Sequence, residues 1–151
     1  MYTKKRIMVL RVVALLLAAV FFCPINADAV EPRASYYLCS YNAYPYAAGN
    51  GLVQIWFTVT GVDYMDDIGS LSIQIYESET DSTNDKDWTF VDSFNNANTP
   101  SILGHDKIFY QSNVDYQGTV GMYYKAYICI YAGRDGGGDT RYFWTGSVQA
   151  T

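Results

Sequence analysis

The chain has 151 residues, of which half are hydrophobic and 17% aromatic, and its formal net charge at pH 7 is −5. This length suits one domain of ordinary size and leaves no room for two. An acidic surface repels nucleic-acid phosphates and anionic lipid headgroups, so neither nucleic acid nor a membrane is expected as a partner.

The N-terminal residues 1–29 have the pattern of a cleavable secretory signal peptide. Four basic residues come before an apolar run at 12–23, and Ala27-Asp28-Ala29 supplies the small-x-small pattern of a signal peptidase site. The run is well short of the ~20 residues that span a bilayer as a helix. We therefore expect cleavage after Ala29 and a secreted, extracellular domain of residues 30–151. The signal removes four basic residues and one acidic residue, which leaves a net charge of −8 on the secreted part.

The secreted part is expected to be an all-β domain. No stretch repeats an apolar i, i+3, i+4 pattern over three turns, whereas several segments alternate apolar and polar residues with period two. Aromatic residues favour strands, and Gly, Asn and Asp cluster between the alternating segments as turn signals. The expected strands are 36–42, 52–60, 70–77, 88–91, 107–115, 123–131 and 140–148.

Seven short strands separated by turns predict an antiparallel immunoglobulin-like or fibronectin type III-like sandwich, with a small β-barrel as the alternative. The segment 121–128 resembles the start of the penultimate strand of fibronectin type III domains, where a tyrosine turns its hydroxyl back to an upstream backbone group. Tyr124 is expected in this role because it continues the buried alternation of its strand. Lys125 marks the opposite side, with Tyr123, Tyr127 and Tyr131, as the side that faces solvent.

Two cysteines, Cys39 and Cys129, remain after removal of the signal. An even number in an exported domain makes a disulfide the usual expectation. Cys129 falls on the outward side of its predicted strand, so a disulfide in the core would need a bulge or a different register. A Cys39–Cys129 disulfide and two unpaired thiols are therefore both left open.

Two acidic loops are candidate calcium sites, because calcium takes carboxylate and carbonyl oxygens and is plentiful outside cells. One contains Asp63, Asp66 and Asp67, and the other contains Asp135 and Asp139 around three glycines. Neither matches the EF-hand loop, and Asp and Gly are also the usual residues of turns. No other cofactor is expected.

Aromatic residues at outward positions are the candidate ligand-binding residues. Trp56 sits on the polar side of its strand, and Tyr123, Tyr127 and Tyr131 form an outward row beside Lys125. Such rows stack on sugar rings or anchor protein partners. The alternative interpretation is a ladder of tyrosines that stabilises the sheet through cross-strand pairs.

The segments 31–38, 61–69, 114–119 and 136–145 together resemble an uncharacterised family of small secreted proteins from Gram-positive, Clostridia-type bacteria. The resemblance covers nearly the whole secreted part. It implies export without an assigned activity, and so it transfers no catalytic residue. It also directs attention to the two Gly/Asp loops and to the last strand, with Arg141 and Trp144 as further candidate binding residues.

We interpret the chain as a non-catalytic secreted binding module for a glycan or an extracellular protein. The single histidine, His105, lies in a predicted loop, and no G-x-S-x-G or H-E-x-x-H motif is present. A small secreted hydrolase that uses carboxylates or His105 is one alternative. A secreted toxin or antimicrobial is another, although the negative charge argues against attack on anionic membranes.

Overall fold

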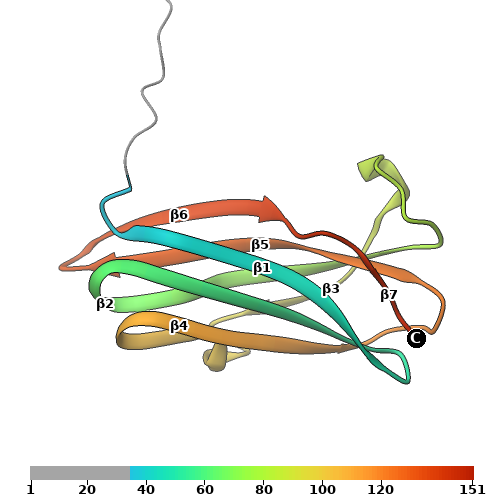
Figure 1. Ribbon diagram of the computed structural model, residues 1–151, viewed down its shortest axis with the longest axis horizontal. Coiled ribbons are helices and arrows are strands. Elements are labelled where there is room, and N and C mark those ends of the chain that lie inside the picture. The colour runs from blue at the N-terminus through green and yellow to red at the C-terminus, as the bar shows by residue number, and fades with distance from the viewer. Residues whose placement is uncertain (1–34) are drawn as a thin grey trace, which may run out of the picture. The chain divides into compact units, whose positions relative to one another are not determined.

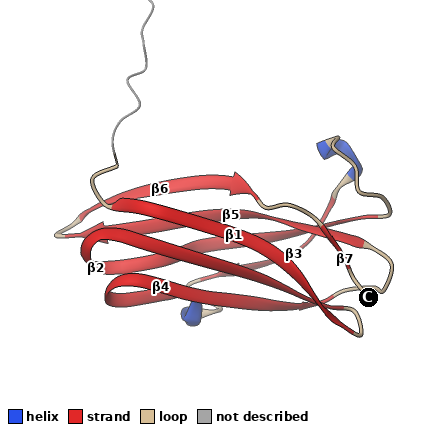
Figure 2. Cartoon of the chain, in the orientation of Figure 1, coloured by secondary structure: helices blue, strands red, loops and turns tan. Residues whose placement is uncertain are grey.

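The computed structural model describes residues 35–151, and the expected signal peptide at 1–29 lies outside them. This region is built almost entirely of antiparallel strands (Figure 2). Two short 3₁₀ helices, η1 at Asp85–Asp87 and η2 at Pro100–Ile102, lie in its connections. The strands are β1 (Leu38–Gly49), β2 (Leu52–Ser78), β3 (Thr89–Asn95), β4 (Leu103–Gln117), β5 (Tyr123–Arg134), β6 (Gly137–Trp144) and β7 (Val148–Gln149).

None of the helical segments between residues 35 and 151 has the length and apolar character needed to span a bilayer.

Strand β2 is long enough to belong to two layers. Its first half pairs with β1 and with the second half of β4, whereas its second half pairs with the first residues of β4, with β3 and with β5. Strands β2 and β4 both bend back at the same end of the molecule (Figure 1). At the bend, residues 61–64 of β2 lie opposite the single residue Ile108 of β4, and such a bulge turns a ladder sharply.

The fold is therefore all-β and antiparallel with seven strands, as the sequence predicted, and its sheet curls back on itself to form two facing layers. The first layer contains β1, residues 52–60 of β2 and residues 109–117 of β4. The second layer contains β3, residues 65–78 of β2, residues 103–107 of β4, β5, β6 and β7. Because β2 and β4 run through the bend, one continuous hydrogen-bonded sheet makes both layers.

The core lies between the layers and follows the period-two alternation. The first layer contributes four fully buried side chains of β2, and the second layer contributes alternate residues of β2 and β5. Burying each such side chain stabilises the fold by about 1.5–3 kcal/mol, which also penalises any one-residue slip in register. The main contributors are Val53, Ile55, Phe57, Val59, Ile73, Ile75, Tyr124, Ile128 and Ile130.

A tight hairpin joins β1 to β2. Its central residues, Asn50 and Gly51, both have positive φ, as the favoured two-residue hairpin turns require. A Cβ at Gly51 would also lie 2.6 Å from the carbonyl oxygen of Gly118. Strand β1 extends through Pro45, past the predicted end at residue 42, because β1 is an edge strand and needs no donor on its free side.

Tyr124 occupies the role that its position predicted. The backbone N–H of Thr119 donates a hydrogen bond to the Tyr124 hydroxyl at 2.8 Å, and this hydroxyl donates to Glu77 Oε2 at 3.1 Å. The ring is fully buried. The hydroxyl therefore fastens the loop before β5 to the second layer.

Besides the longer β1, the observed strands β3, β4 and β5 are a few residues longer than predicted, and the arrangement of strands differs at two places. The strands expected at 52–60 and 70–77 are one strand, because the acidic segment between them forms the bend instead of a loop. The strand expected at 140–148 begins earlier, at Gly137, and ends at Trp144, before the separate short strand β7. The β5–β6 turn is formed by Asp135 and Gly136, which both have positive φ.

Candidate binding face

The outer face of the first layer gathers aromatic and polar side chains around Trp56. In the observed register Trp56 lies between Tyr44 of β1 and Asn113 of β4, and Gln54 lies between Tyr46 and Asp115. Side chains two residues apart on a strand share a face, so these two rows form a compact grid. We call it the Trp56 face; its residues are Tyr44, Tyr46, Gln54, Trp56, Asn113 and Asp115.

Four of these side chains form a hydrogen-bonded network across β2 and β4. Trp56 Nε1 donates to Gln54 Oε1 at 3.1 Å, and Gln54 Nε2 donates to Asp115 Oδ1 at 2.9 Å. Asn113 Nδ2 donates to the same Asp115 oxygen at 2.7 Å. The orientation of the indole is therefore fixed by Gln54, which is held in turn by the carboxylate.

The tyrosines beside Trp56 are open to solvent. Tyr44 is 48% exposed and Tyr46 is 54% exposed. Within the described part of the chain, none of the three rings stacks on another aromatic ring. Flat apolar area next to fixed polar groups is what stacking on a sugar ring requires.

The positions around the Trp56 face continue the same chemistry. Most outward residues on the three strands have hydroxyl or amide side chains, with the exposed Phe109 beside Thr60 as an apolar exception, and these outward positions hold no lysine or arginine. The neighbouring side chains are Ser40, Asn42, Thr58, Thr60, Gln111 and Gln117. The surface is thus rich in uncharged hydrogen-bonding groups, with Asp115 as the charged member of the grid.

The outer face of the second layer gathers a different aromatic group around Lys125. The ring of Trp144 lies 4.9 Å from Tyr76 and 5.0 Å from Tyr127, measured between ring centroids, and Tyr127 stacks on Tyr142 at 6.0 Å. Trp88 comes from the segment that follows η1. We call this group the Lys125 cluster; it contains Tyr76, Trp88, Phe90, Lys125, Tyr127, Tyr142 and Trp144.

Lys125 lies on the outer side of β5, as predicted, but its side chain is buried there instead of facing solvent. Its Nζ lies 4.5 Å from the centroid of the Trp88 ring, 4.2 Å from that of Trp144 and 2.9 Å from Asp85 Oδ1. The polar segment between β2 and β3 crosses this face and brings Asp85 and Trp88 with it. Two aromatic rings and one carboxylate compensate the charge locally, which the alternation of β5 by itself could not reveal.

Replacing Lys125 with methionine is expected to lower the free energy of unfolding by about 1–2 kcal/mol, because the cation–π contacts and the Asp85 ion pair are lost while the apolar stem stays. Urea denaturation followed by tryptophan fluorescence measures this change. The matched control is the exposed Lys86→Met, expected within ~0.5 kcal/mol of the parent. Equal stability of the two variants would show that the contacts of Lys125 with the two tryptophan rings and with Asp85 do not stabilise the fold.

The predicted outward tyrosine row is only partly a row. Tyr127 belongs to the Lys125 cluster, but Tyr123 and Tyr131 are half-buried and make no aromatic pair within residues 35–151. The Tyr131 ring covers Gly138, where a Cβ would lie 2.6 Å from a ring carbon. Tyr131 therefore packs against backbone, as in the structural-ladder interpretation.

Trp144 and Arg141 do not share a face. Trp144 contacts Lys125 on the outer side, whereas Arg141 pairs with Ile130 of β5, whose side chain points into the core. Arg141 Nη1 donates to the carbonyl oxygen of Thr140 at 2.8 Å. The two residues therefore cannot act together on one ligand.

The two predicted calcium loops meet at one end of the molecule, but their carboxylates have protein partners. Asp63 Oδ2 lies 2.9 Å from Arg134 Nη1, and Asp66 Oδ2 accepts the backbone N–H of Asp135 at 2.8 Å. Hydrogen bonding by the Tyr64 backbone N–H and by Arg134 holds the pKa of the Asp63 carboxyl below its usual value.

The remaining residues of these loops point to other partners. Asp67 Oδ1 lies 2.7 Å from Nδ1 of the exposed His105. Asp139 accepts hydrogen bonds from the Ser35 hydroxyl at 2.6 Å and the Tyr37 backbone N–H at 3.0 Å, which lower the pKa of its carboxyl. Between residues 35 and 151, no three His, Cys, Asp or Glu side chains are grouped in an arrangement suited to a metal ion.

The two cysteines are both free, so of the two alternatives left open by the sequence the structure has unpaired thiols. Cys39 is exposed at a bulge near the start of β1, whereas Cys129 is buried on the outward side of β5 beneath the second layer's surface residues. Burial raises the pKa of the Cys129 thiol, and hydrogen bonding to Cys129 raises the pKa of Tyr142.

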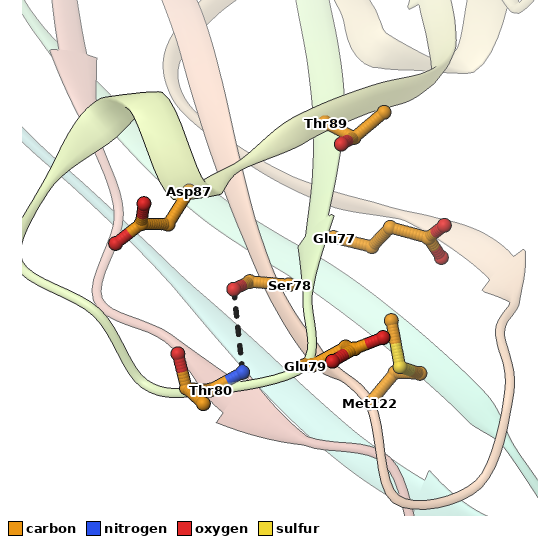
Figure 3. A pocket seen from close by; sticks show the side chains of 7 residues that line it. All are labelled: Glu77, Ser78, Glu79, Thr80, Asp87, Thr89 and Met122. Carbon is orange, nitrogen blue, oxygen red and sulfur yellow. Dashed lines mark hydrogen bonds between the residues drawn. The ribbon is translucent and has the colours of Figure 1, made fainter.

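An acidic cleft of about 420 Å³ was not predicted from the sequence. It lies where β2 ends, and its lining includes Glu77, Glu79 and Asp87. The carboxylates of Glu77 and Asp87 lie on opposite sides of the cleft and point away from each other, while the Ser78 hydroxyl accepts the Thr80 backbone N–H at 3.3 Å (Figure 3). The acidic groups therefore do not converge on one point.

No protein-family model matches the chain, and no curated protein matches it. Among solved structures, the sporulation control protein Spo0M from Bacillus subtilis is 12% identical over 74% of this chain and 49% of its own, with a TM-score of 0.39. A family 76 glycoside hydrolase from a bovine Bacteroides thetaiotaomicron strain is 16% identical over 72% of this chain and 20% of its own, with a TM-score of 0.34. The chain thus spans about half the length of the first protein and a fifth of the second, and likeness at these scores carries no function across.

Proposed function

We propose that the domain is a non-catalytic, exported binding module that holds a glycan on the Trp56 face. The observation behind this proposal is the network in which Gln54 and Asp115 fix the Trp56 indole next to two exposed tyrosine rings. A ring held in place loses little side-chain entropy when a ligand binds, so the stacking energy is not offset by ordering.

The second aromatic group supports the choice of face by contrast. The rings of the Lys125 cluster pack tilted or edge-on against one another, and Lys125 already lies against two of them. Ring area used in such contacts is not available to a flat ligand, and the ring area that stays exposed, mainly on Phe90 and Tyr142, is divided between the separate strands β3 and β6. The tyrosine-ladder interpretation therefore suits the second layer, and the ligand-binding interpretation suits the first.

Replacing Trp56 with alanine is expected to weaken glycan binding at least tenfold, because the central apolar platform is removed. The test screens the purified protein on a glycan array and then measures retardation in native gels that contain each polysaccharide retained. Tyr142→Ala is the matched control, since it removes an exposed ring from the other face.

Circular dichroism and thermal melting of both variants establish that they remain folded. Equal retardation of Trp56→Ala and the parent protein, or a selective loss in Tyr142→Ala, would refute the assignment of the glycan to the Trp56 face.

A further inference from the structure

We infer that the Trp56 face selects neutral over anionic glycans, and that Asp115 is the residue that determines this selection. The inference rests on the proposed function, since it concerns the same face. It is drawn from the hydrogen-bonding pattern of one carboxylate and from the placement of the basic residues.

The first step concerns the free oxygen of Asp115. Both amide donors of the network, Gln54 Nε2 and Asn113 Nδ2, bond to Oδ1. Oδ2 of this exposed side chain accepts no hydrogen bond from the described residues, so it can accept one from a ligand. An ionised carboxylate only accepts hydrogen bonds, so it can take one from a sugar hydroxyl but not from a carboxylate, sulfate or phosphate group.

The second step concerns charge. The outward positions of the first layer hold no cation, and the basic residues in the described region lie elsewhere. Lys125 and Arg134 are in ion pairs on the second layer and near the bend, and Lys86 lies in η1. Lys107 pairs with Met65 beyond the bend, and Arg141 lies on β6. An anionic group placed at the Trp56 face would therefore meet Asp115 without a compensating charge.

The third step concerns the neutral part of the network. After its bonds to Trp56 and Asp115, the Gln54 amide keeps one N–H, and Asn113 keeps its carbonyl oxygen and one N–H. Together with Asp115 Oδ2, these groups offer two donors and two acceptors beside the indole. Neighbouring hydroxyls of a sugar, each both donor and acceptor, match this set better than a charged group does.

The test compares retardation of the parent protein in native gels containing neutral polysaccharides (laminarin, galactomannan) or anionic ones (polygalacturonate, hyaluronate). Asp115→Asn is the main variant, because asparagine keeps the shape and one acceptor oxygen while removing the charge. Asp92→Asn, at an exposed position on β3, is the matched control for overall charge.

We expect the parent protein to be retarded by at least one neutral polysaccharide and at least tenfold less by the anionic ones. Asp115→Asn is expected to lower the ratio of neutral to anionic retardation at least threefold, and Asp92→Asn is expected to leave this ratio unchanged. Added salt screens exposed charges, so 0.5 M NaCl should lower the preference of the parent protein for neutral polysaccharides, as Asp115→Asn does.

Other results would overturn the inference. Retardation by polygalacturonate that equals or exceeds that by neutral polymers, and that Trp56→Ala abolishes, would refute neutral selectivity while leaving the proposed glycan function in place. A preference unchanged in Asp115→Asn would refute the role of this carboxylate. Retention of no polysaccharide, on the array or in the gels, would refute the proposed function and the inference together.

Discussion

Replacing Tyr124 with alanine is expected to lower the free energy of unfolding by about 3–5 kcal/mol, because it leaves a large cavity in the core of the second layer. The ring is fully buried and packs against Tyr116 at 5.5 Å between centroids. Chemical denaturation at pH 7 measures the change. Tyr64→Phe, at an exposed position on the bend, is the control expected to stay within ~0.5 kcal/mol of the parent.

The Tyr124→Phe variant separates the hydroxyl from the ring. It keeps the packing but leaves the Thr119 N–H without its acceptor, so we expect a loss of about 1–3 kcal/mol. If Tyr124→Phe costs as much as Tyr124→Ala, or costs nothing, the hydroxyl does not fasten this loop as described.

The Tyr124 hydroxyl is also expected to make the free energy of unfolding depend on pH in the alkaline range. Burial raises the pKa of Tyr124 above its ordinary value of about 10, so the unfolded chain loses this proton at a lower pH than the folded one. The stabilisation is fully present below pH ~10 and is lost as the pH rises from there toward the folded-state pKa. Stability measured between pH 8 and 11 should therefore fall less steeply in Tyr124→Phe than in the parent.

Replacing Gly69 with alanine is expected to lower the free energy of unfolding by about 3 kcal/mol or more. Gly69 has a φ of +146°, and an added methyl group would overlap the backbone carbonyl oxygen of Ile102 and lie 3.1 Å from the Tyr110 ring. Strain in the backbone and overpacking each cost about 1–3 kcal/mol. The glycine is placed where β2 pairs with both β4 and β5, so no neighbour can move freely.

The matched control for Gly69 is Gly136→Ala in the β5–β6 turn. Gly136 also has a positive φ, +77°, but an added methyl group would meet nothing within 4 Å. Only the conformational strain of about 1 kcal/mol then remains. Similar thermal melting temperatures for the two variants would contradict the close packing described around Gly69.

The β class, most of the core and the role of Tyr124 could be predicted from local patterns. In the segments 52–60 and 123–131 one side of the strand is buried, which gives alternating apolar and polar residues. This pattern can be recognised within a few consecutive residues. The bend in β2 could not be predicted in this way. Gly61 and the acidic residues after it are the same types that form loops, and only the pairing with β4 shows that the strand continues.

The candidate site likewise contains residues that a local pattern predicts and residues that only the pairing of distant strands brings together. Trp56 could be predicted because it interrupts the polar side of an alternating strand. Asn113 and Asp115 could not, because they meet Trp56 and Gln54 through a register between strands that lie far apart in the sequence. The burial of Lys125 could not be predicted for a similar reason, since Asp85 and Trp88 come from a segment about 40 positions earlier and Trp144 comes from β6.

The shared strand β2 also determines how the domain bears a mechanical load. A polymer held at Trp56 pulls on a strand with hydrogen-bonded neighbours on both sides, rather than on an edge strand that could be peeled away one bond at a time. The same strand continues into the second layer between β3 and β5. Tension applied along β2 is therefore divided among four neighbouring strands, and the proposed attachment point lies on the segment of the domain that is hardest to pull out.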